Sequence, residues 1–216
     1  MRAIAWPVHT PLKEILYDWG GANVWLFHAV NDIRSGFLDA FMQLGTGLGD
    51  HGLFPVYMAL LALSAAFAVA RTPLSDPVQF RECALLWSSV VAVFGVAYVL
   101  DGLLIDLAKP LLDLPRPPLA LPPETIHIIG QPEYHHSLPS GHASFAMLVV
   151  ASLWPVLGRR LRVAGVLFVL WVGISRVSLG AHFPADVAAG YLSSLIVVLL
   201  VRASARAVIR TAAGTQ

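Results

Sequence analysis

The chain has 216 residues, of which 57% are hydrophobic and only 12% are charged, and its formal net charge is +1. Soluble domains carry roughly 25% charged residues, so this composition, with a mean hydropathy of +0.71, excludes an ordinary soluble domain and indicates a membrane protein. The length fits a single domain over residues 1–216, no nucleic-acid partner is expected, and the single cysteine excludes an internal disulfide.

The N-terminal part of the chain contains no obvious membrane span. Residues 1–15 contain prolines where the apolar core of a secretion signal would run, so no signal is predicted. Residues 23–30 are apolar, but charged residues follow between positions 32 and 39, within one helix length. The segment 22–48 is therefore expected to be either a tilted first span, which we favour, or an amphipathic helix on the membrane surface.

A glycine-rich run, Gly-Thr-Gly-Leu-Gly, occupies residues 45–49. It resembles a phosphate-binding loop, but it lacks the lysine and the hydroxyl residue that follow the glycines of a nucleotide-binding loop. We therefore interpret it as a turn between two helices.

Five later segments are predicted to cross the membrane. A helix needs about 20 residues to cross a hydrocarbon layer of about 30 Å. Uncharged runs, extended into their flanks, place spans near residues 53–70, 83–108, 140–157, 162–180 and 186–203. The expected fold is an all-α polytopic membrane bundle of about six helices.

Basic residues concentrate in three regions next to these spans. They are Arg71 and Arg81, then Arg159, Arg160 and Arg162, and finally Arg202, Arg206 and Arg210. Basic connections of membrane proteins face the cytoplasm, so these three regions are expected on that side. The connections that hold the motifs described next are then expected to face the periplasm or the cell exterior.

The one long connection, residues 110–139, is rich in proline and carries side chains that could bind a metal: Glu124, His127, Glu133, His135 and His136. The adjacent His135 and His136 lack the i, i+4 spacing of a helical zinc site. We therefore expect a solvated loop that faces a ligand, and no metal site.

The string Pro-Ser-Gly-His at residues 139–142 marks a junction between this loop and a helix. Ser140 suits the N-cap position, and Gly141 allows the backbone to approach a ligand closely. The free N–H groups and the positive end of the helix would bind an anion there, within reach of His142. Taken alone, the string could equally be an ordinary helix cap beside an incidental histidine.

A second string, SRVSLGAHFPAD at residues 175–186, places a base, a histidine and an acid around a turn. Pro184 suits the first position of the next helix, and Arg176 falls near the end of the preceding span. Asp186 lies four residues after His182 and can bind one imidazole nitrogen, which leaves the other free to attack. A helix-dipole role for Asp186 and an interfacial role for Arg176 are possible, but neither explains why both flank a histidine.

A third string, KPLLDLPRP at residues 109–117, ends another span. Arg116 stands between two prolines, so its backbone is stiff, and its planar guanidinium suits bidentate contact with a phosphate. Asp101 and Asp106 precede Lys109 in an apolar context, where an ionisable group is costly. We expect Asp106 to pair with Lys109.

In chain order, the strings read Lys, six residues, Arg-Pro; then Pro-Ser-Gly-His; then Ser-Arg, five residues, His, three residues, Asp. This pattern resembles the three-part signature of the type 2 phosphatidic acid phosphatase (PAP2) superfamily, and every signature position is matched. That superfamily includes membrane lipid phosphatases and soluble vanadium haloperoxidases. The resemblance implies a helical core of the PAP2 and haloperoxidase type and cleavage of phosphate esters or anhydrides.

The resemblance also implies roles for the matched residues. His182 would be the nucleophile that forms a phosphohistidine, Asp186 would orient it, and His142 would be the general acid and later the general base. The phosphate oxygens would be held by the remaining signature residues, Lys109, Arg116, Ser140, Gly141 and Arg176. No cofactor or metal is expected, because fixed cations supply the charge that phosphoryl transfer needs.

The motifs indicate that the substrate has a phosphate group, but they do not indicate which molecule bears it. The short chain and compact loops resemble bacterial undecaprenyl-diphosphate phosphatases, so undecaprenyl diphosphate at the inner membrane, with the site facing outward, is the first expectation. Phosphatidylglycerophosphate, phosphatidic acid and a lipid A phosphate are further candidate substrates. The same residues would also fit a lipid phosphotransferase that uses the phosphohistidine. A non-catalytic lipid transporter or scaffold is the alternative hypothesis from a different functional class. The sequence leaves the oligomeric state open.

Overall fold

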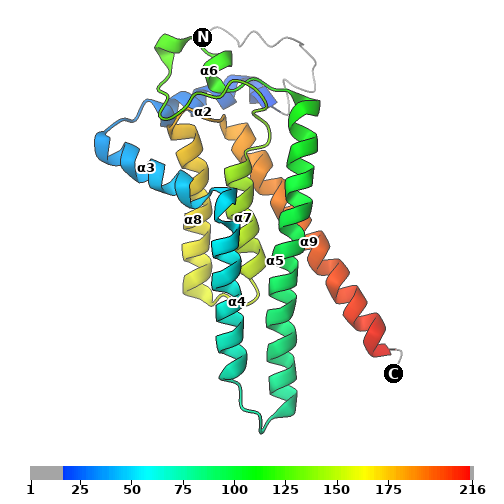
Figure 1. The fold of residues 1–216 in the computed structure, drawn as a ribbon. Helices are drawn as coiled ribbons and strands as arrows, with labels where there is room; N and C mark the ends of the chain where they lie inside the picture. The colour runs from blue at the N-terminus through cyan, green and yellow to red at the C-terminus, as the bar shows by residue number, and fades with distance from the viewer. Residues whose placement is uncertain (1–16, 215–216) are drawn as a thin grey trace.

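The computed structural model describes residues 17–214, with side chains up to residue 207, so the prediction about a secretion signal lies outside it. Within this range every regular element is helical (Figure 1). The elements, in order, are η2 (Trp19–Gly21), α2 (Ala22–Asn31), α3 (Gly36–Leu48), η3 (His51–Leu53), α4 (Phe54–Ala70), α5 (Pro77–Leu112), α6 (Pro117–Ala120), η4 (Pro123–Thr125), α7 (Gly141–Leu153), α8 (Arg159–Ser178) and α9 (Pro184–Gly214). The predicted all-α class is confirmed.

Four helical stretches in the described chain are long and apolar enough to cross a membrane. They are His51–Ala70, Pro77–Ala120, Arg159–Ser178 and Pro184–Ala207, and they correspond to four of the five predicted spans. The fifth predicted span is shorter than expected, because α7 has 13 residues and ends at Leu153 instead of near 157. Most residues of α7 are buried, since it lies among α5, α8 and α9. A central helix is covered by protein and need not match the thickness of the lipid layer.

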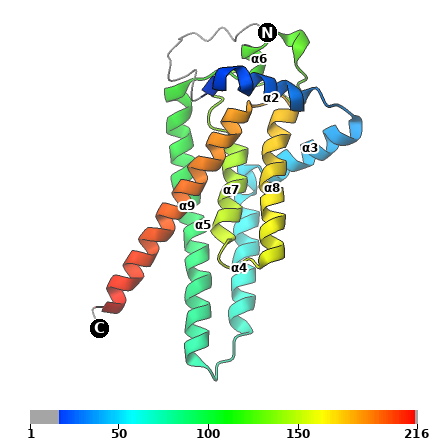
Figure 2. The same ribbon diagram turned by 180° about the vertical axis from the view of Figure 1, so that it is seen from behind.

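The segment 22–48 does not form one helix. It divides into α2 and α3, of 10 and 13 residues, and neither reaches the length of about 20 residues that a span requires. The favoured interpretation as a first span is therefore wrong. The break follows from local capping, because Ser35 Oγ accepts a hydrogen bond from Leu38 N at 3.1 Å and starts a new helix. In Figures 1 and 2, α2 lies across the ends of α8 and α9 at the upper end of the bundle.

The glycine-rich run belongs mostly to a helix. Residues 45–48 form the last turn of α3, Gly49 caps it, and the chain turns only at residues 49–50, so the turn predicted over 45–49 was placed too early. Helix α3 packs closely on α8. A β carbon at Gly45 would lie 2.8 Å from Nε1 of Trp171, so this approach requires glycine.

Three apolar clusters hold the described part of the bundle together, and the two larger ones are described here. One fills the space between α4, α5, α7 and α9 and includes the fully buried Phe94 and Phe145. The other lies beneath α2, where the rings of Phe27 and Phe183 are 5.4 Å apart and both side chains are completely buried. The second cluster fixes α2 against the turn that enters α9.

The basic regions and the motifs lie at different ends of the molecule. The α4–α5 connection, the start of α8 and the end of α9 lie in the lower half of Figure 1, whereas the long loop after α5 and the turn before α9 lie at the top. The grouping of the three basic regions agrees with the sequence prediction. Their side of the membrane is considered below as a proposal.

Candidate active site

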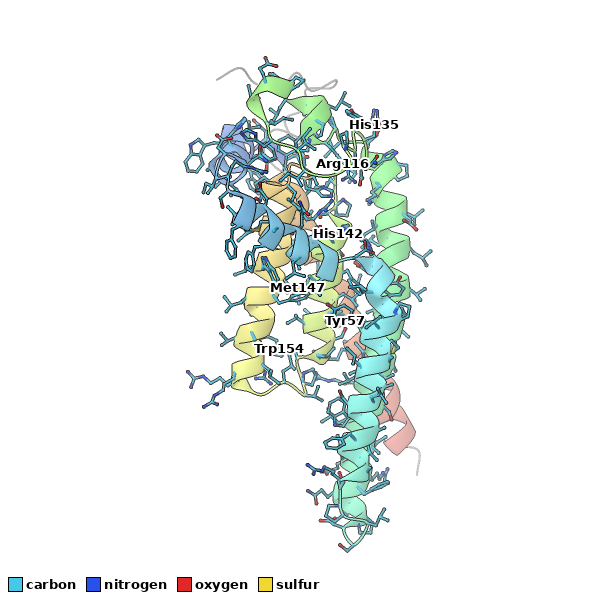
Figure 3. All side chains as sticks on the ribbon, turned by 60° about the vertical axis from the view of Figure 1, so that its left-hand side comes forward. Tyr57, Arg116, His135, His142, Met147 and Trp154 are labelled. Carbon is cyan, nitrogen blue, oxygen red and sulfur yellow. The ribbon has the colours of Figure 1, made fainter. Side chains whose placement is uncertain are left out.

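The three motifs converge at the upper end of the bundle. The end of α5, the start of α6, the start of α7, the end of α8 and the turn into α9 contribute the motif residues, which are Lys109, Arg116, Ser140, Gly141, His142, Arg176, His182 and Asp186. In Figure 3, Arg116 and His142 lie in the upper part of the molecule, whereas Met147 and Trp154 follow α7 away from it. Segments far apart in the sequence therefore meet at one place.

His182 and Asp186 form a buried pair at the start of α9. Pro184 is the first residue of α9, as predicted, which puts Asp186 in the first turn. Nδ1 of His182 lies 3.4 Å from Oδ2 of Asp186, and the two residues are 2% and 0% exposed. The other ring nitrogen, Nε2, lies 3.3 Å from Nη1 of Arg116. With the proton on Nδ1, the lone pair of Nε2 faces the guanidinium.

The carboxylate of Asp186 is held by three further donors. Its Oδ1 accepts a hydrogen bond from the Tyr17 hydroxyl at 2.9 Å. Its Oδ2 accepts from Ser137 Oγ at 2.5 Å and from the Phe183 N–H at 2.8 Å. Sequence reasoning did not find Tyr17 or Ser137. Ser137 precedes the Pro-Ser-Gly-His string closely, and Tyr17 has no sequence signal, because its role depends on how α2 folds over the site.

The environment of His182 keeps its imidazole neutral. Complete burial, followed by the nearby guanidinium groups of Arg116 and Arg176, lowers the pKa of His182 well below its ordinary value. An unperturbed histidine titrates at about 6.5, so His182 carries no charge near neutral pH. A neutral imidazole with one nitrogen bound to a carboxylate has the features of a nucleophile.

Arg116 is buried and is surrounded by acceptors. Its Nη2 pairs with Oε2 of Glu133 at 2.7 Å, and its Nε donates to the His135 carbonyl at 3.0 Å. Glu133 comes from the long loop, and 61% of its side chain is exposed. Its carboxylate therefore occupies a position in which Arg116 could hold an anion. The sequence singled out Glu133 only as a residue of a ligand-facing loop.

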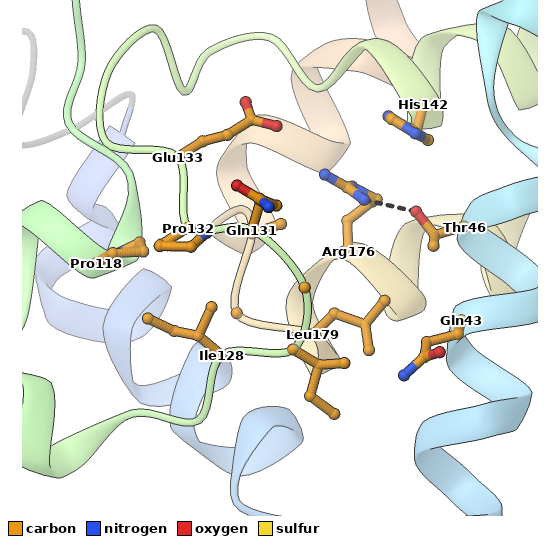
Figure 4. Close-up of a pocket in the computed structure, with 14 residues that line it drawn as sticks. Gln43, Thr46, Pro118, Ile128, Gln131, Pro132, Glu133, His142, Arg176 and Leu179 are labelled. Atoms are coloured by element: carbon orange, nitrogen blue, oxygen red, sulfur yellow. Dashed lines mark hydrogen bonds between the residues drawn. The ribbon is translucent and has the colours of Figure 1, made fainter.

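A cavity of about 490 Å³ is lined by Glu133, the ion-pair partner of Arg116. Its polar lining includes Thr46, Glu133, His142 and Arg176 (Figure 4). Nη1 of Arg176 donates to Thr46 Oγ1 at 2.6 Å, whereas its buried Nε has no hydrogen-bond partner in the described part of the chain. An imidazole and a guanidinium thus face a space large enough for a phosphate group.

The Pro-Ser-Gly-His string begins α7, as predicted, but its capping differs. Ser140 stands at the N-cap, yet its Oγ is buried and makes no hydrogen bond to the described residues. Its N–H instead donates to the Asp186 carbonyl at 2.9 Å, which joins α7 to α9. A β carbon at Gly141 would lie 2.6 Å from Cε1 of His51, so the space left by this glycine is taken by an imidazole ring.

Lys109 faces a neighbouring cavity of about 460 Å³, which His51, Asp101 and Asp106 also line. The expected ion pair between Asp106 and Lys109 is not among the ion pairs within 4.0 Å in residues 17–207, so that prediction is wrong. Asp101 instead accepts hydrogen bonds from Ser144 Oγ at 2.6 Å and Ser194 Oγ at 2.9 Å. These hydroxyls explain how an acidic residue is accommodated in an apolar helix. The described residues contain no group of three or more His, Cys, Asp or Glu placed to hold a metal ion.

Comparison with known proteins identifies related chains. Residues 90–210 match the model of the PAP2 superfamily. A lipid A 1-phosphatase of Rhizobium johnstonii is 30% identical over 159 residues, and one of Rhizobium etli is 30% identical over 158 residues. Each alignment covers 68% of this chain, but only 60% and 63% of the two relatives. The matched part is thus less than two thirds of their length.

Two crystal structures share the fold. The structure of Aquifex aeolicus LpxE has a TM-score of 0.68 and 23% identity, and the match covers 83% of this chain and 94% of that one. The structure of a transmembrane PAP2-type phosphatidylglycerolphosphate phosphatase from Bacillus subtilis has a TM-score of 0.62 and 22% identity, with coverage of 89% and 91%. At these identities the likeness supports the fold and carries no residue roles.

Proposed function

This chain belongs to the PAP2 superfamily, and we propose that it is a membrane lipid phosphatase that acts through a phosphohistidine on His182. One observation carries the proposal: the buried His182 has the Asp186 carboxylate at one ring nitrogen and Arg116 at the other, next to a cavity that His142 and Arg176 line. The arrangement supplies a neutral nucleophile and fixed positive charge within one site, which is what phosphoryl transfer requires.

In the first proposed step, Nε2 of His182 attacks phosphorus, and the bond between phosphorus and the lipid oxygen breaks. His142 gives its proton to that oxygen, so the lipid leaves as a neutral alcohol or as the acid of a shorter phosphate. The imidazole of His182 becomes positively charged, and the carboxylate of Asp186 stabilises it. Because Tyr17 and Ser137 fix this carboxylate, it needs no rearrangement during the reaction.

In the second proposed step, water attacks the phosphohistidine. The now neutral His142 takes a proton from the water, inorganic phosphate forms, and His182 returns to its neutral state. Charge on the phosphoryl oxygens is balanced by Arg116, Arg176 and Lys109, and the hydroxyl of Ser140 and the N–H groups at the start of α7 supply hydrogen bonds. The buried, unpartnered Ser140 Oγ supports its place in this set.

For the substrate, we propose a lipid A phosphate as the first candidate. The support is the similarity to two lipid A 1-phosphatases over most of this chain. This choice departs from undecaprenyl diphosphate, which the sequence alone favoured and which remains a candidate, as does phosphatidylglycerophosphate. The site lies at the upper end of the bundle in Figure 1, where lipid head groups would lie in a membrane. This position supports access of a lipid substrate to the site from the membrane surface.

We further propose that the protein lies in the bacterial inner membrane with this site facing the periplasm. The three basic regions in the lower half of Figure 1 support a cytoplasmic position for that end. Cysteine substitution at Arg160 tests the orientation, because an impermeant thiol reagent added from outside should not label it. Labelling of this cysteine before the cells are opened would show that the orientation is opposite to the proposed one.

Phosphate release by the detergent-purified protein tests the activity. The panel contains lipid A, undecaprenyl diphosphate, phosphatidylglycerophosphate and phosphatidic acid, each with wild type and His182→Ala, with and without a chelator. We expect release from lipid A that is lost in the variant and unaffected by chelator. Release of phosphate from another lipid would identify that lipid as the substrate. If a folded protein released no phosphate from any lipid, the proposed phosphatase activity would be contradicted.

A further inference from the structure

The glycine-rich end of α3, together with the turn from α3 into η3, borders this site. Thr46 accepts the hydrogen bond of Arg176 shown as a dashed line in Figure 4. Gly45, one residue earlier, packs on Trp171 of α8 and brings Thr46 to that arginine. This segment precedes residues 90–210, so the match to the family does not cover it.

The same segment presents an acid to His142. Oδ2 of Asp50 lies 3.8 Å from Nε2 of His142. The carboxylate is anchored, because its Oδ1 accepts a hydrogen bond from the Gly52 N–H at 2.6 Å and caps η3. The ring of His51 stands edge-on to the His142 ring, with centroids 5.8 Å apart. The imidazole is therefore bordered by one fixed carboxylate and one further ring.

We propose that Asp50 is a positioning residue for His142. The carboxylate faces Nε2 of His142 at an ion-pair distance and stabilises the imidazolium, so that Nδ1 carries the proton given to the departing lipid oxygen. The proton leaves the imidazolium as the phosphorus–oxygen bond breaks, and the attacking water replaces it in the second step. This inference rests on the phosphatase proposed above and adds a second pairing of carboxylate and imidazole to it.

The charges around His142 explain why such a partner is needed. Burial lowers the pKa of His142 most, and Arg176 from α8, His51 from η3 and His182 from the turn before α9 lower it further, to about 3 in the protein without substrate. Asp50 is the acid that raises this pKa. Among the acids on helices packed against α7, Asp101 is engaged with hydroxyls and Asp186 with its three donors. Asp106 of α5 lines the neighbouring cavity with Lys109. Asp50 is 57% exposed and has one backbone donor, so its charge remains available to His142.

The test replaces Asp50 with asparagine, which also caps helices well and so removes the charge while keeping the hydrogen bond to Gly52. Asp76→Asn is the matched control, because Asp76 caps α5 through Gln79 N at 3.0 Å at the opposite end of the molecule. Each variant is assayed with a lipid phosphate and with p-nitrophenyl phosphate. An alcohol leaving group needs a proton, whereas p-nitrophenolate leaves without one.

For Asp50→Asn we expect kcat on the lipid to fall about tenfold or more, since general acid catalysis contributes about 10²–10⁴. The rate with p-nitrophenyl phosphate should change little, and Asp76→Asn should match wild type. The basic limb of the kcat profile, which reports the complex with substrate, should move to lower pH. An equal loss on both substrates, or no loss on either, would overturn the inference while leaving the phosphatase intact.

A second measurement does not depend on turnover. In ¹⁵N-histidine spectra across pH, with the His142 signal assigned by its loss in His142→Ala, we expect Asp50→Asn to reduce the protonated fraction of His142. An unchanged fraction overturns the role of Asp50 whatever the activity. A reduced fraction in a protein that releases no phosphate from any lipid supports the pairing and counts against the proposed function alone.

Discussion

The carboxylate of Glu133 lies 2.7 Å from the guanidinium of Arg116, and Glu133 lines the same cavity as His142 and Arg176. Such a charge-assisted contact is the one that a phosphate group would make with Arg116. In the proposed mechanism, Glu133 therefore occupies the place of the substrate anion, and the substrate would displace it before the phosphoryl group reaches His182.

Glu133→Gln should lower KM for the lipid phosphate several-fold, because the substrate no longer competes with a carboxylate for Arg116. Affinity for inorganic phosphate as an inhibitor should rise in the same variant, and kcat should change less than KM. Initial rates over a range of substrate and phosphate concentrations measure all three quantities. A higher KM in Glu133→Gln would mean that the carboxylate helps to bind the substrate.

Tyr17→Phe should reduce kcat, because it removes the donor to Oδ1 of a fully buried carboxylate and loosens the orientation of Asp186. Leaving a buried acceptor without a partner costs about 1–3 kcal/mol, so the thermal midpoint should also fall. Tyr191→Phe is the control, since the Tyr191 hydroxyl donates to the Val169 carbonyl at 2.6 Å away from the motif residues. Equal kcat losses in the two variants would argue against a role for Tyr17 in the site.

The pH dependence of kcat/KM should show an acid limb below pH 6.5. Neutral His182 is the attacking form, so the rate falls only when the pH drops through the pKa of His182, which burial and the neighbouring arginines hold well below its ordinary value of about 6.5. Burial and the nearby cations lower the pKa of His142 to about 3 in the free protein, so its protonated form is expected only when the phosphate anion is bound. The basic limb of the bell-shaped profile should therefore appear in kcat, which reports the complex. An acid limb centred above pH 6.5, or a flat kcat profile from pH 5 to 9, would contradict these assignments.

Asp101→Ala should destabilise the bundle more than it slows the reaction. The change leaves the hydroxyls of Ser144 and Ser194 without their shared acceptor in the interior, at a cost of about 1–3 kcal/mol. Asp101→Asn retains an acceptor and should recover much of the loss. Thermal unfolding in detergent measures the difference, and an Asp101→Ala variant as stable as wild type would show that the carboxylate contributes nothing to the fold.

The sequence predicted most of the site because phosphate chemistry uses few residue types at short, regular spacings. Arg116, His142, Arg176, His182 and Asp186 were all identified from three strings, and the structure brings them together. Helix α7 ends at Leu153, but the apolar residues continue to position 157, so hydropathy did not mark its end and the predicted length of that span was wrong. The break between α2 and α3 was missed because a single capping serine was outweighed by the apolar residues around it.

Other parts of the site depend on tertiary contacts that no local pattern records. Tyr17, Thr46 and Asp50 reach the motif residues only because α2, α3 and η3 fold over them, and Glu133 was one of several acids and histidines in a long loop. That residues 1–216 form one domain stays a prediction, because the described range is 17–214. The roles of the motif residues likewise stay proposals until the reaction is measured.

Trapping the phosphoenzyme tests the central claim most directly. The protein is mixed with a lipid A substrate carrying a ³²P-labelled phosphate, quenched within the first turnover, and analysed for protein-bound label that is labile to acid and stable to alkali. We predict label on His182 in the wild type, with or without chelator, and no label in His182→Ala. In His142→Ala, provided that the first step still proceeds, the level of label should be higher, because the second step is slowed. Release of phosphate without any labelled protein, or label that persists in His182→Ala, would contradict the mechanism.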